Sequence, residues 1–222
     1  MDDMTFRAIK VLKEVDLILA EDTRTSSVLL RHFDVHTPLS SYHLHNEHER
    51  TGKIIDQLLE GKNIALVSDA GTPGISDPGF MLSRECRQKG IDIQCLPGAT
   101  AFVPALVDSG LPTDRFVFEG FLPPKKGRAT RLAELSADPR TVVIYESPKR
   151  LARTLRQLAE VFGPEREAAV AREISKLHET IHKGSLSSLA DHFDSNKPKG
   201  EIVIVIEGKG KSSPRQDYEN ND

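Results

Sequence analysis

The sequence predicts an α/β protein with largely parallel sheets, and three observations carry that prediction. Short apolar runs alternate with segments of helical periodicity, the pattern of strands joined by crossover helices. A loop rich in Gly, Pro and Asp, residues 68–79, follows the apolar run 64–67. A second glycine-containing loop, 97–101, follows the run 91–96. Because open α/β sheets bind ligands at the carboxyl ends of their strands, the two loops predict a binding cleft at one sheet edge.

The first half of the chain is expected to fold as one domain. Aliphatic runs predict strands at residues 16–20, 39–43, 64–67 and 91–96, the third of them buried. Apolar residues at helical spacing predict helices at residues 5–14, 26–33, 47–59, 81–89 and 101–108, and residues 21–25 are expected to form a polar loop. The turn at 109–112 is the expected boundary, which gives an N-terminal domain of residues 1–111.

The second half, residues 112–208, repeats the alternation. Strands are expected at residues 115–121, 141–145, 167–172, 179–183 and 201–207, with helices at 127–137, 150–162 and 185–193. Pro78 and Pro148 are expected to end their segments without joining a sheet ladder, since proline has no N–H to donate. The polar tail, residues 209–222, is expected to be disordered.

Composition narrows the class of protein. With 222 residues, 38% hydrophobic and 28% charged, the chain resembles ordinary globular proteins. It has no apolar run long enough to span a bilayer and no signal-peptide pattern, so we expect a cytoplasmic protein without a membrane partner. Cys86 and Cys95 are expected to be reduced core thiols. A net charge of −3 means that any polyanion must be bound by a local patch.

Several distinctive motifs lie in order along residues 2–208. They are Ala20-Glu21-Asp22-Thr23-Arg24, Ser40-Ser41-Tyr42-His43, the loop 68–79, Leu96-Pro97-Gly98, residues 109–122, Tyr145-Glu146-Ser147-Pro148, Ala171-Arg172-Glu173 and Pro198-Lys199-Gly200-Glu201. With these motifs the chain resembles the tetrapyrrole methylase superfamily, and within it the members that methylate a cytidine 2′-hydroxyl in the decoding region of small-subunit (16S) ribosomal RNA. The superfamily usually opens with a strand and a Thr-Pro-x-Gly-Asn loop, which have no counterpart before the matched segment 2–8.

The resemblance implies a fold, a cofactor and partners. It implies two α/β domains, with a mainly parallel N-terminal sheet and a mixed C-terminal sheet, S-adenosylmethionine in the cleft between them, and a homodimer. The implied substrate is small-subunit rRNA or the assembled small ribosomal subunit. Two alternatives remain open: a tetrapyrrole (precorrin-type) methyltransferase, and, without the opening strand, a non-catalytic RNA- or ribosome-binding module. The basic loop at 125–131 and the loop 68–79 favour RNA.

The resemblance also assigns site residues. Those expected to bind the cofactor are Ser68, Asp69, Ala70, Gly71, Thr72, Pro97, Gly98, Thr100, Ala101, Tyr145, Ala171, Arg172, Lys199 and Gly200. A ribose hydroxyl is a weak nucleophile, so a general base would help. The candidates are Glu21, Asp22 and Glu146, which follow or end predicted strands, and then Asp77, Glu173 and His178. Asp22 has a competing interpretation as a helix N-cap, and Asp69 as a loop-stabilising side chain.

Four cations within seven residues form the candidate RNA-binding patch. They are Lys125, Lys126, Arg128 and Arg131, and Arg24 is expected to contribute from elsewhere, with Arg31, Lys149 and Arg150 as extensions. A cluster of histidines invites a metal interpretation, but the spacing of His43, His45 and His48 fits neither a HExxH helix nor a zinc finger. No metal is therefore expected, and His43 is expected to lie in the cleft.

Overall fold

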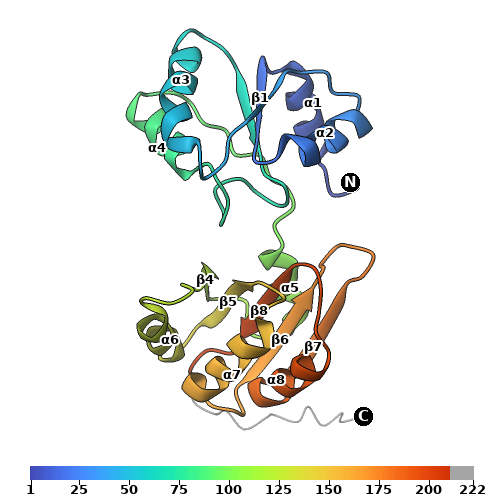
Figure 1. Cartoon of the computed structure of the whole chain (residues 1–222), viewed down its shortest axis with the longest axis vertical. Coiled ribbons are helices and arrows are strands. Elements are labelled where there is room, and N and C mark those ends of the chain that lie inside the picture. The colour runs from blue at the N-terminus through green and yellow to red at the C-terminus, as the bar shows by residue number, and fades with distance from the viewer. Residues whose placement is uncertain (211–222) are drawn as a thin grey trace, which may run out of the picture. The chain divides into compact units, whose positions relative to one another are not determined.

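The computed structural model describes residues 1–210, which form two compact units, residues 1–100 and the residues from 101 on (Figure 1). The division precedes helix α5 (Phe102–Ser109), whereas the sequence places the boundary after it. Helix α5 belongs to the second unit because Ala105 and Leu106 pack with Val143 and Val205 of that unit's sheet. The tail expected to be disordered lies, from residue 211 on, outside the described residues.

The first unit is built on three parallel strands. Strand β1 (Leu17–Ala20) lies between β2 (Leu39–Ser41) and β3 (Ile64–Val67). Helices α1 (Phe6–Glu14) and α2 (Thr23–His32) contribute Leu12 and Leu30 to a core around Ile18. Helices α3 (Glu47–Leu59) and α4 (Phe80–Gln88) pack with Leu19 on the other face. Helices thus cover both faces of the sheet, as its parallel pairing requires.

The strand expected at residues 91–96 is absent, and this part of the prediction is wrong. The segment forms no ladder with any described strand. Its alternating Ile91 and Ile93 pack against the core beside α3 and α4, so the apolar pattern reports burial without strand pairing. Strand β3 is in consequence an edge strand and only half-buried rather than buried. Cys95, in the same segment, is exposed, and only Cys86 is a core thiol, with a pKa raised by burial.

The second unit contains a mixed five-stranded sheet, which confirms the predicted fold class. Its strands are β4 (Phe116–Phe121), β5 (Thr141–Glu146), β6 (Glu167–Arg172), β7 (Thr180–Ser185) and β8 (Ile202–Ile206), in the order β4-β5-β8-β6-β7. Strand β4 is parallel to β5, whereas β8 is antiparallel to both of its neighbours, β5 and β6. Strands β5 and β6 therefore run in the same direction, and their carboxyl ends reach the same edge.

Alternate residues of this sheet face two different cores. Val142 and Ile144 face helices α6 (Arg128–Ser136), α7 (Leu151–Phe162) and α8 (Leu186–Ser195). Val143 and Tyr145 face α5 on the other side. Residues 203 and 205 of β8 share the α5 face with them, and residues 202, 204 and 206 face the other three helices. The uninterrupted apolar runs of β5 and β8 reflect this burial on both faces.

Two smaller sequence predictions can also be compared with the fold. Pro78 and Pro148 lie in turns outside every ladder, as predicted. Helix α2 begins at Thr23, so the polar loop expected at residues 21–25 is shorter than predicted. The remaining elements lie where the sequence places them, with ends displaced by a few residues.

Gly79, at the end of the long loop, provides a test of the fold. Its φ is 133°, and a Cβ there would lie 2.8 Å from Leu66 Cδ2 of β3. We expect Gly79→Ala to lower the free energy of unfolding by about 1–3 kcal/mol, because both strain and a clash oppose it. Gly52→Ala is the matched control. A Cβ there meets nothing within 4 Å, so this helix substitution should be neutral or stabilise by about 0.5–1 kcal/mol. Urea denaturation of both variants measures the difference, and equal stabilities would contradict it.

Candidate functional site

The carboxyl ends of β1 and β3 bring two pairs of candidate residues together. Ala20 lies opposite Val67 in the ladder, so Glu21 and Asp22 leave the sheet beside Ser68 and Asp69. The backbone N–H of Asp22 donates to Asp69 Oδ1 at 3.2 Å. Asp69 thus stabilises the neighbouring loop, as its alternative interpretation predicts, and its side chain remains exposed at the strand end.

The two glycine-containing loops meet through Thr72. Its Oγ1 donates to the carbonyl of Ala99 at 3.2 Å and lies 2.8 Å from Oγ1 of Thr100. Gly71, beside it, has a φ of 78°, which permits the tight turn after the strand. The two loops are therefore in contact, although the second one does not follow a strand. Both ends of the contact belong to the first unit.

Asp22 serves as the N-cap of α2. Its Oδ1 accepts from the N–H of Arg24 at 2.8 Å, and its carboxylate also binds the Arg24 guanidinium, with the closest contact at 2.6 Å. These bonds to Arg24 lower the pKa of Asp22 to about 2. A carboxylate with so low a pKa is a poor general base near neutral pH. The structure thus supports the N-cap interpretation of Asp22, which also binds Arg24, and Glu21 is the other candidate base at this strand end.

The loop after β2 places His43 at the same end of the sheet. Ser41 lies opposite Ala20 in the parallel ladder, and Tyr42 continues the pairing by donating its N–H to the carbonyl of Ala20 at 2.7 Å. Asn46 holds His43 by accepting from its backbone N–H at 2.8 Å. His43 Nδ1 is buried and has no hydrogen-bond partner among the described residues. His43 thus lies at the same end of the sheet as Glu21, and its place in a cleft stays a prediction.

The second unit gathers its candidates at one edge of its own sheet. Ile202 of β8 lies opposite Glu146 on one side and Arg172 on the other. The strand ends Tyr145-Glu146 and Ala171-Arg172 are therefore level, and Lys199 and Gly200 reach the same edge just before β8. The cofactor-binding residues predicted in this half of the chain are thus brought together.

A network of hydrogen bonds fixes this edge. Arg172 donates to the carbonyl oxygens of Lys199 and His178 at 2.7 and 2.9 Å. Glu173 Oε1 accepts from the Glu201 N–H at 2.8 Å, and this bond chiefly lowers the pKa of Glu173. Gly200 has a φ of 95°, and a Cβ there would lie 2.3 Å from Glu173 Cδ. Glu173, a lesser candidate base, therefore stabilises the turn.

Glu146, a predicted catalytic residue, is buried among polar partners. Its side chain is 1% exposed, and Arg150 lies at 2.8 Å from Oε1. Its Oε2 accepts from the hydroxyl of Thr154 at 2.7 Å. Glu146 shares a sheet face with Ile144, toward α6 and α7, whereas Tyr145 faces α5. The carboxylate is enclosed on the side opposite to the candidate cofactor residue Tyr145, so it holds the helices in place rather than meeting a substrate.

The predicted cationic patch contains two arginines that bind other side chains of the protein and two exposed lysines. Arg128 is buried and donates to Gln157 and Thr154 at 2.9 and 2.8 Å. Its guanidinium is therefore not exposed for the phosphate contact that the sequence predicts. Arg131 binds Glu119 at 2.7 Å, which raises its pKa. By contrast, Lys125 and Lys126 are exposed. These two lysines are what remains of the patch, since Arg24 is engaged with Asp22.

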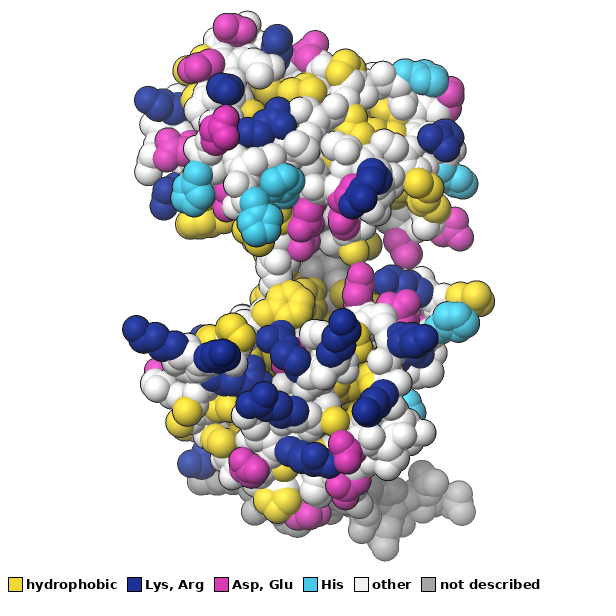
Figure 2. All heavy atoms as spheres, viewed as in Figure 1, with side chains coloured by type: hydrophobic (Ala, Val, Ile, Leu, Met, Phe, Trp, Pro, Cys, Tyr) yellow, Lys and Arg dark blue, Asp and Glu magenta, His cyan; other side chains and the backbone are white. Residues whose placement is uncertain are grey.

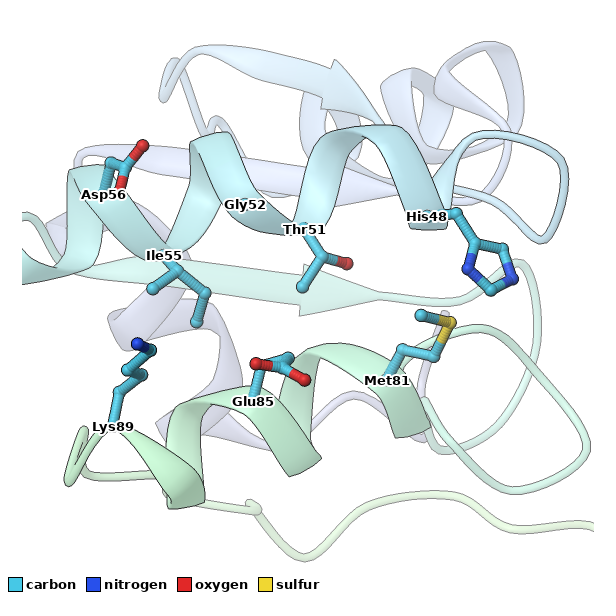
Figure 3. A pocket seen from close by; sticks show the side chains of 8 residues that line it. All are labelled: His48, Thr51, Gly52, Ile55, Asp56, Met81, Glu85 and Lys89. Atoms are coloured by element: carbon cyan, nitrogen blue, oxygen red, sulfur yellow. The ribbon is translucent and has the colours of Figure 1, made fainter.

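A groove of about 330 Å³ lies elsewhere, between α3 and α4 (Figure 3). Figure 3 shows its lining side chains on the two facing helices: His48, Thr51, Ile55, Asp56, Met81, Glu85 and Lys89, with Gly52. None of the residues predicted to bind cofactor or RNA lines it. We therefore place the candidate site at the strand ends rather than in this groove.

No three or more His, Cys, Asp or Glu side chains within residues 1–210 are grouped so that they could hold a metal ion. No helix in that range has the length and apolar character needed to cross a membrane.

Comparison with known proteins identifies relatives over nearly the whole chain. Residues 1–190 match the family model of Tetrapyrrole (Corrin/Porphyrin) Methylases. Ribosomal RNA small subunit methyltransferase I of Synechocystis is 51% identical over 209 residues, which cover 94% of this chain and 75% of that protein. The protein of the same name from Thermotoga maritima is 46% identical, with 94% of each chain covered.

Solved structures with the same fold are more distant in sequence. The methyltransferase CobJ has a TM-score of 0.70 at 20% identity, covering 94% of this chain and 89% of that one. Cobalt precorrin-4 methyltransferase, CbiF, has a TM-score of 0.67 at 18% identity, covering 93% and 89%. At such identities the likeness establishes the fold alone.

The buried network around Glu146 yields a stability prediction. The guanidinium of Arg128, also nearly buried, lies 3.8 Å from Glu146 Oε2. Glu146→Ala removes the carboxylate from this buried cation, so we expect a loss of about 3–5 kcal/mol in the free energy of unfolding. Glu21→Gln is the control, because Glu21 lies at a strand end with no enclosing network, and it should change stability by less than about 0.5 kcal/mol. Chemical denaturation of both variants provides the comparison. A Glu146→Ala protein as stable as the parent would contradict the stabilising role of this network.

Proposed function

This chain belongs to the tetrapyrrole methylase family, and from that premise we propose that it transfers a methyl group from S-adenosylmethionine to small-subunit ribosomal RNA. The proposed acceptor is the 2′-hydroxyl of a cytidine in the decoding region. The proposed working form is a cytoplasmic homodimer that acts on the rRNA or on the assembled small subunit.

One observation decides between RNA and a tetrapyrrole as the acceptor. The two rRNA methyltransferases described above are 51% and 46% identical to this chain, whereas the methyltransferase CobJ and the cobalt precorrin-4 methyltransferase, which share the fold, are 20% and 18% identical. Fold likeness by itself does not carry an activity, since one fold hosts many reactions. Identity near one half over 94% of the chain favours a shared substrate class, and we therefore choose RNA.

The residues of the first unit suit the methionine portion of the cofactor. An amino acid group requires a carboxylate for its ammonium and N–H donors for its own carboxylate. Asp69 offers an exposed carboxylate at the end of β3, and the turn through Gly71 bares backbone groups beside it. Thr72 and Thr100 fix that turn through their 2.8 Å contact. We assign Ser68 to Thr72, with residues 97–100, to this portion, together with Ala101, the first residue of the second unit.

The residues of the second unit suit an adenosine. Tyr145 offers a half-buried ring, and Ala171 belongs to the same hydrophobic cluster, on the other side of Val203. The turn at Lys199 and Gly200 is rigid because Arg172 binds the carbonyl of Lys199. Preorganised turns of this kind hold a ligand without an ordering cost at binding. We therefore assign this edge to the nucleoside portion.

The cofactor supplies a methyl group already activated by the positive charge on sulfur, so the protein's task is alignment and proton removal. The acceptor oxygen would bond to the methyl carbon as the carbon–sulfur bond breaks and S-adenosylhomocysteine leaves. The hydroxyl would lose its proton in this step, and a carboxylate at the site would take it. Among the three preferred acids, Asp22 caps a helix and Glu146 is enclosed. Glu21 is the remaining one, and we propose it as the general base.

Transfer of a tritiated methyl group tests the function directly. Small ribosomal subunits that lack the modification are incubated with this protein and labelled S-adenosylmethionine, and a precorrin is offered in parallel. We expect label in the rRNA and none in the corrinoid. Label in the corrinoid alone would assign the tetrapyrrole reaction. Bound cofactor with no label in either acceptor would assign a binding role, and either result overturns the proposal.

Two substitutions separate cofactor binding from proton removal. Asp69→Asn should weaken S-adenosylmethionine binding about tenfold or more, because a charge-assisted hydrogen bond is lost. Glu21→Gln should leave that affinity unchanged and lower kcat by about 10²–10⁴-fold. Calorimetry gives the affinities and the tritium assay gives the rates. Equal effects of both variants on affinity would contradict the assignment of roles.

A further inference from the structure

A row of four aromatic rings crosses the second unit and ends at its surface. Phe102 of α5 stacks on Phe118 with ring centroids 4.5 Å apart. Phe118 meets Tyr145 edge-on at 5.0 Å, and Tyr145 meets Phe121 in the same manner at 5.6 Å. Phe121, the last of the four, is 52% exposed. An exposed phenylalanine supported by other rings presents an apolar π-face that is held in one orientation.

An irregularity in β4 puts Phe121 into this row. Residues three apart in a regular strand point to opposite faces of the sheet. The register shifts between Phe118 and Gly120, so Phe118 lies opposite Val143 while Phe121 lies opposite Tyr145. Gly120 has a φ of 70°, a conformation that glycine adopts readily. The bulge therefore returns Phe121 to the α5 face, and without it the ring would point to the other side.

Free positive charge lies at the same edge as Phe121. The loops that leave β4 and β5 at this edge carry Lys125, Lys126 and Lys149, which are all exposed. Nearby carboxylates are engaged by other cations, Glu119 by Arg131 and Glu146 by Arg150. Within residues 1–210 no ion pair involves any of the three lysines. Figure 2 shows Lys and Arg side chains gathered on one face of this unit, with hydrophobic side chains between them.

We propose that Phe121, supported by Tyr145, stacks on an unpaired base of the RNA substrate while Lys125, Lys126 and Lys149 bind the phosphates beside it. A rigid aromatic surface next to cations is the combination by which proteins hold single-stranded nucleic acid. The inference rests on the proposed function and deepens it. Tyr145 is also among the residues assigned to the adenosine, so a base on Phe121 would lie beside a residue assigned to the methyl donor.

Binding of a fluorescein-labelled, single-stranded RNA 12-mer, followed by anisotropy, tests the stacking. Phe121→Ala should weaken binding about 5- to 150-fold, the range for loss of one stacked base. Phe121→Trp should bind as the parent does, because it keeps a π-face. Phe121→Leu keeps apolar volume without a π-face and should bind weakly. Parent-like binding by the Ala or the Leu variant overturns the proposal.

The salt dependence separates stacking from charge. Phe121→Ala should leave the slope of log K against log[salt] unchanged, whereas each of Lys125→Gln, Lys126→Gln and Lys149→Gln should reduce its magnitude by about 0.7. Unchanged slopes in the lysine variants would remove these residues from the interface. Thermal melting checks that each variant is folded.

Methyl transfer to small ribosomal subunits, measured in parallel, distinguishes failure of the stacking inference from failure of the proposed function. If the parent protein methylates rRNA but the Phe121 variants bind RNA normally, only the stacking inference fails. If the parent protein neither binds RNA nor methylates it, the proposed function fails with it.

Discussion

The backbone pairing of β8 with both β5 and β6 is the constraint on which the second unit depends. All five residues of β8 are buried, and the strand is hydrogen-bonded on both sides. Because it runs antiparallel to each neighbour, it sets β5 and β6 parallel and makes their ends level. A shift of one residue in this register would turn each side chain of β8 to the opposite face of the sheet. The packing of the cores on both faces would then be disrupted. The placement of Tyr145, Arg172 and Gly200 at one edge follows from this pairing.

Charge in the candidate site is divided between holding the fold and remaining free for a ligand. Asp22 with Arg24, and Glu146 with Arg150, join a strand end to the start of the helix that follows it. In both places the acid lies at or just after the end of a strand. The cation lies in the helix that follows or at the N-cap of that helix. These pairs fix the turns next to Asp69, which binds the Asp22 N–H, and next to Tyr145, the residue before Glu146. Rigid support of this kind is what a binding site needs to hold its ligand in one geometry.

The two units bring their predicted ligand residues together through different contacts. In the first, side chains join the loops, through Asp69 with the Asp22 N–H and Thr72 with Thr100. In the second, the ladder itself aligns the candidates, and Arg172 and Glu173 secure the turn before β8. Both have predicted ligand residues at strand carboxyl ends, Ser68 and Asp69 after β3 and Tyr145 and Arg172 in β5 and β6, and open α/β sheets bind small molecules at such ends.

The sequence by itself determined the alternation of strands and helices, the loops at the strand ends and the family, because apolar period, turn residues and motifs are local properties. It did not determine that residues 91–96 lack a partner, since alternating side chains report burial and not backbone pairing. Nor did it separate Arg128 from Lys125, because a run of cations does not say which of them a distant carboxylate will enclose. Nor did it determine on which face of the sheet Phe121 lies. A glycine inside a strand pattern suggests a bulge, but only the register with Val143 and Tyr145 decides which face the next ring takes.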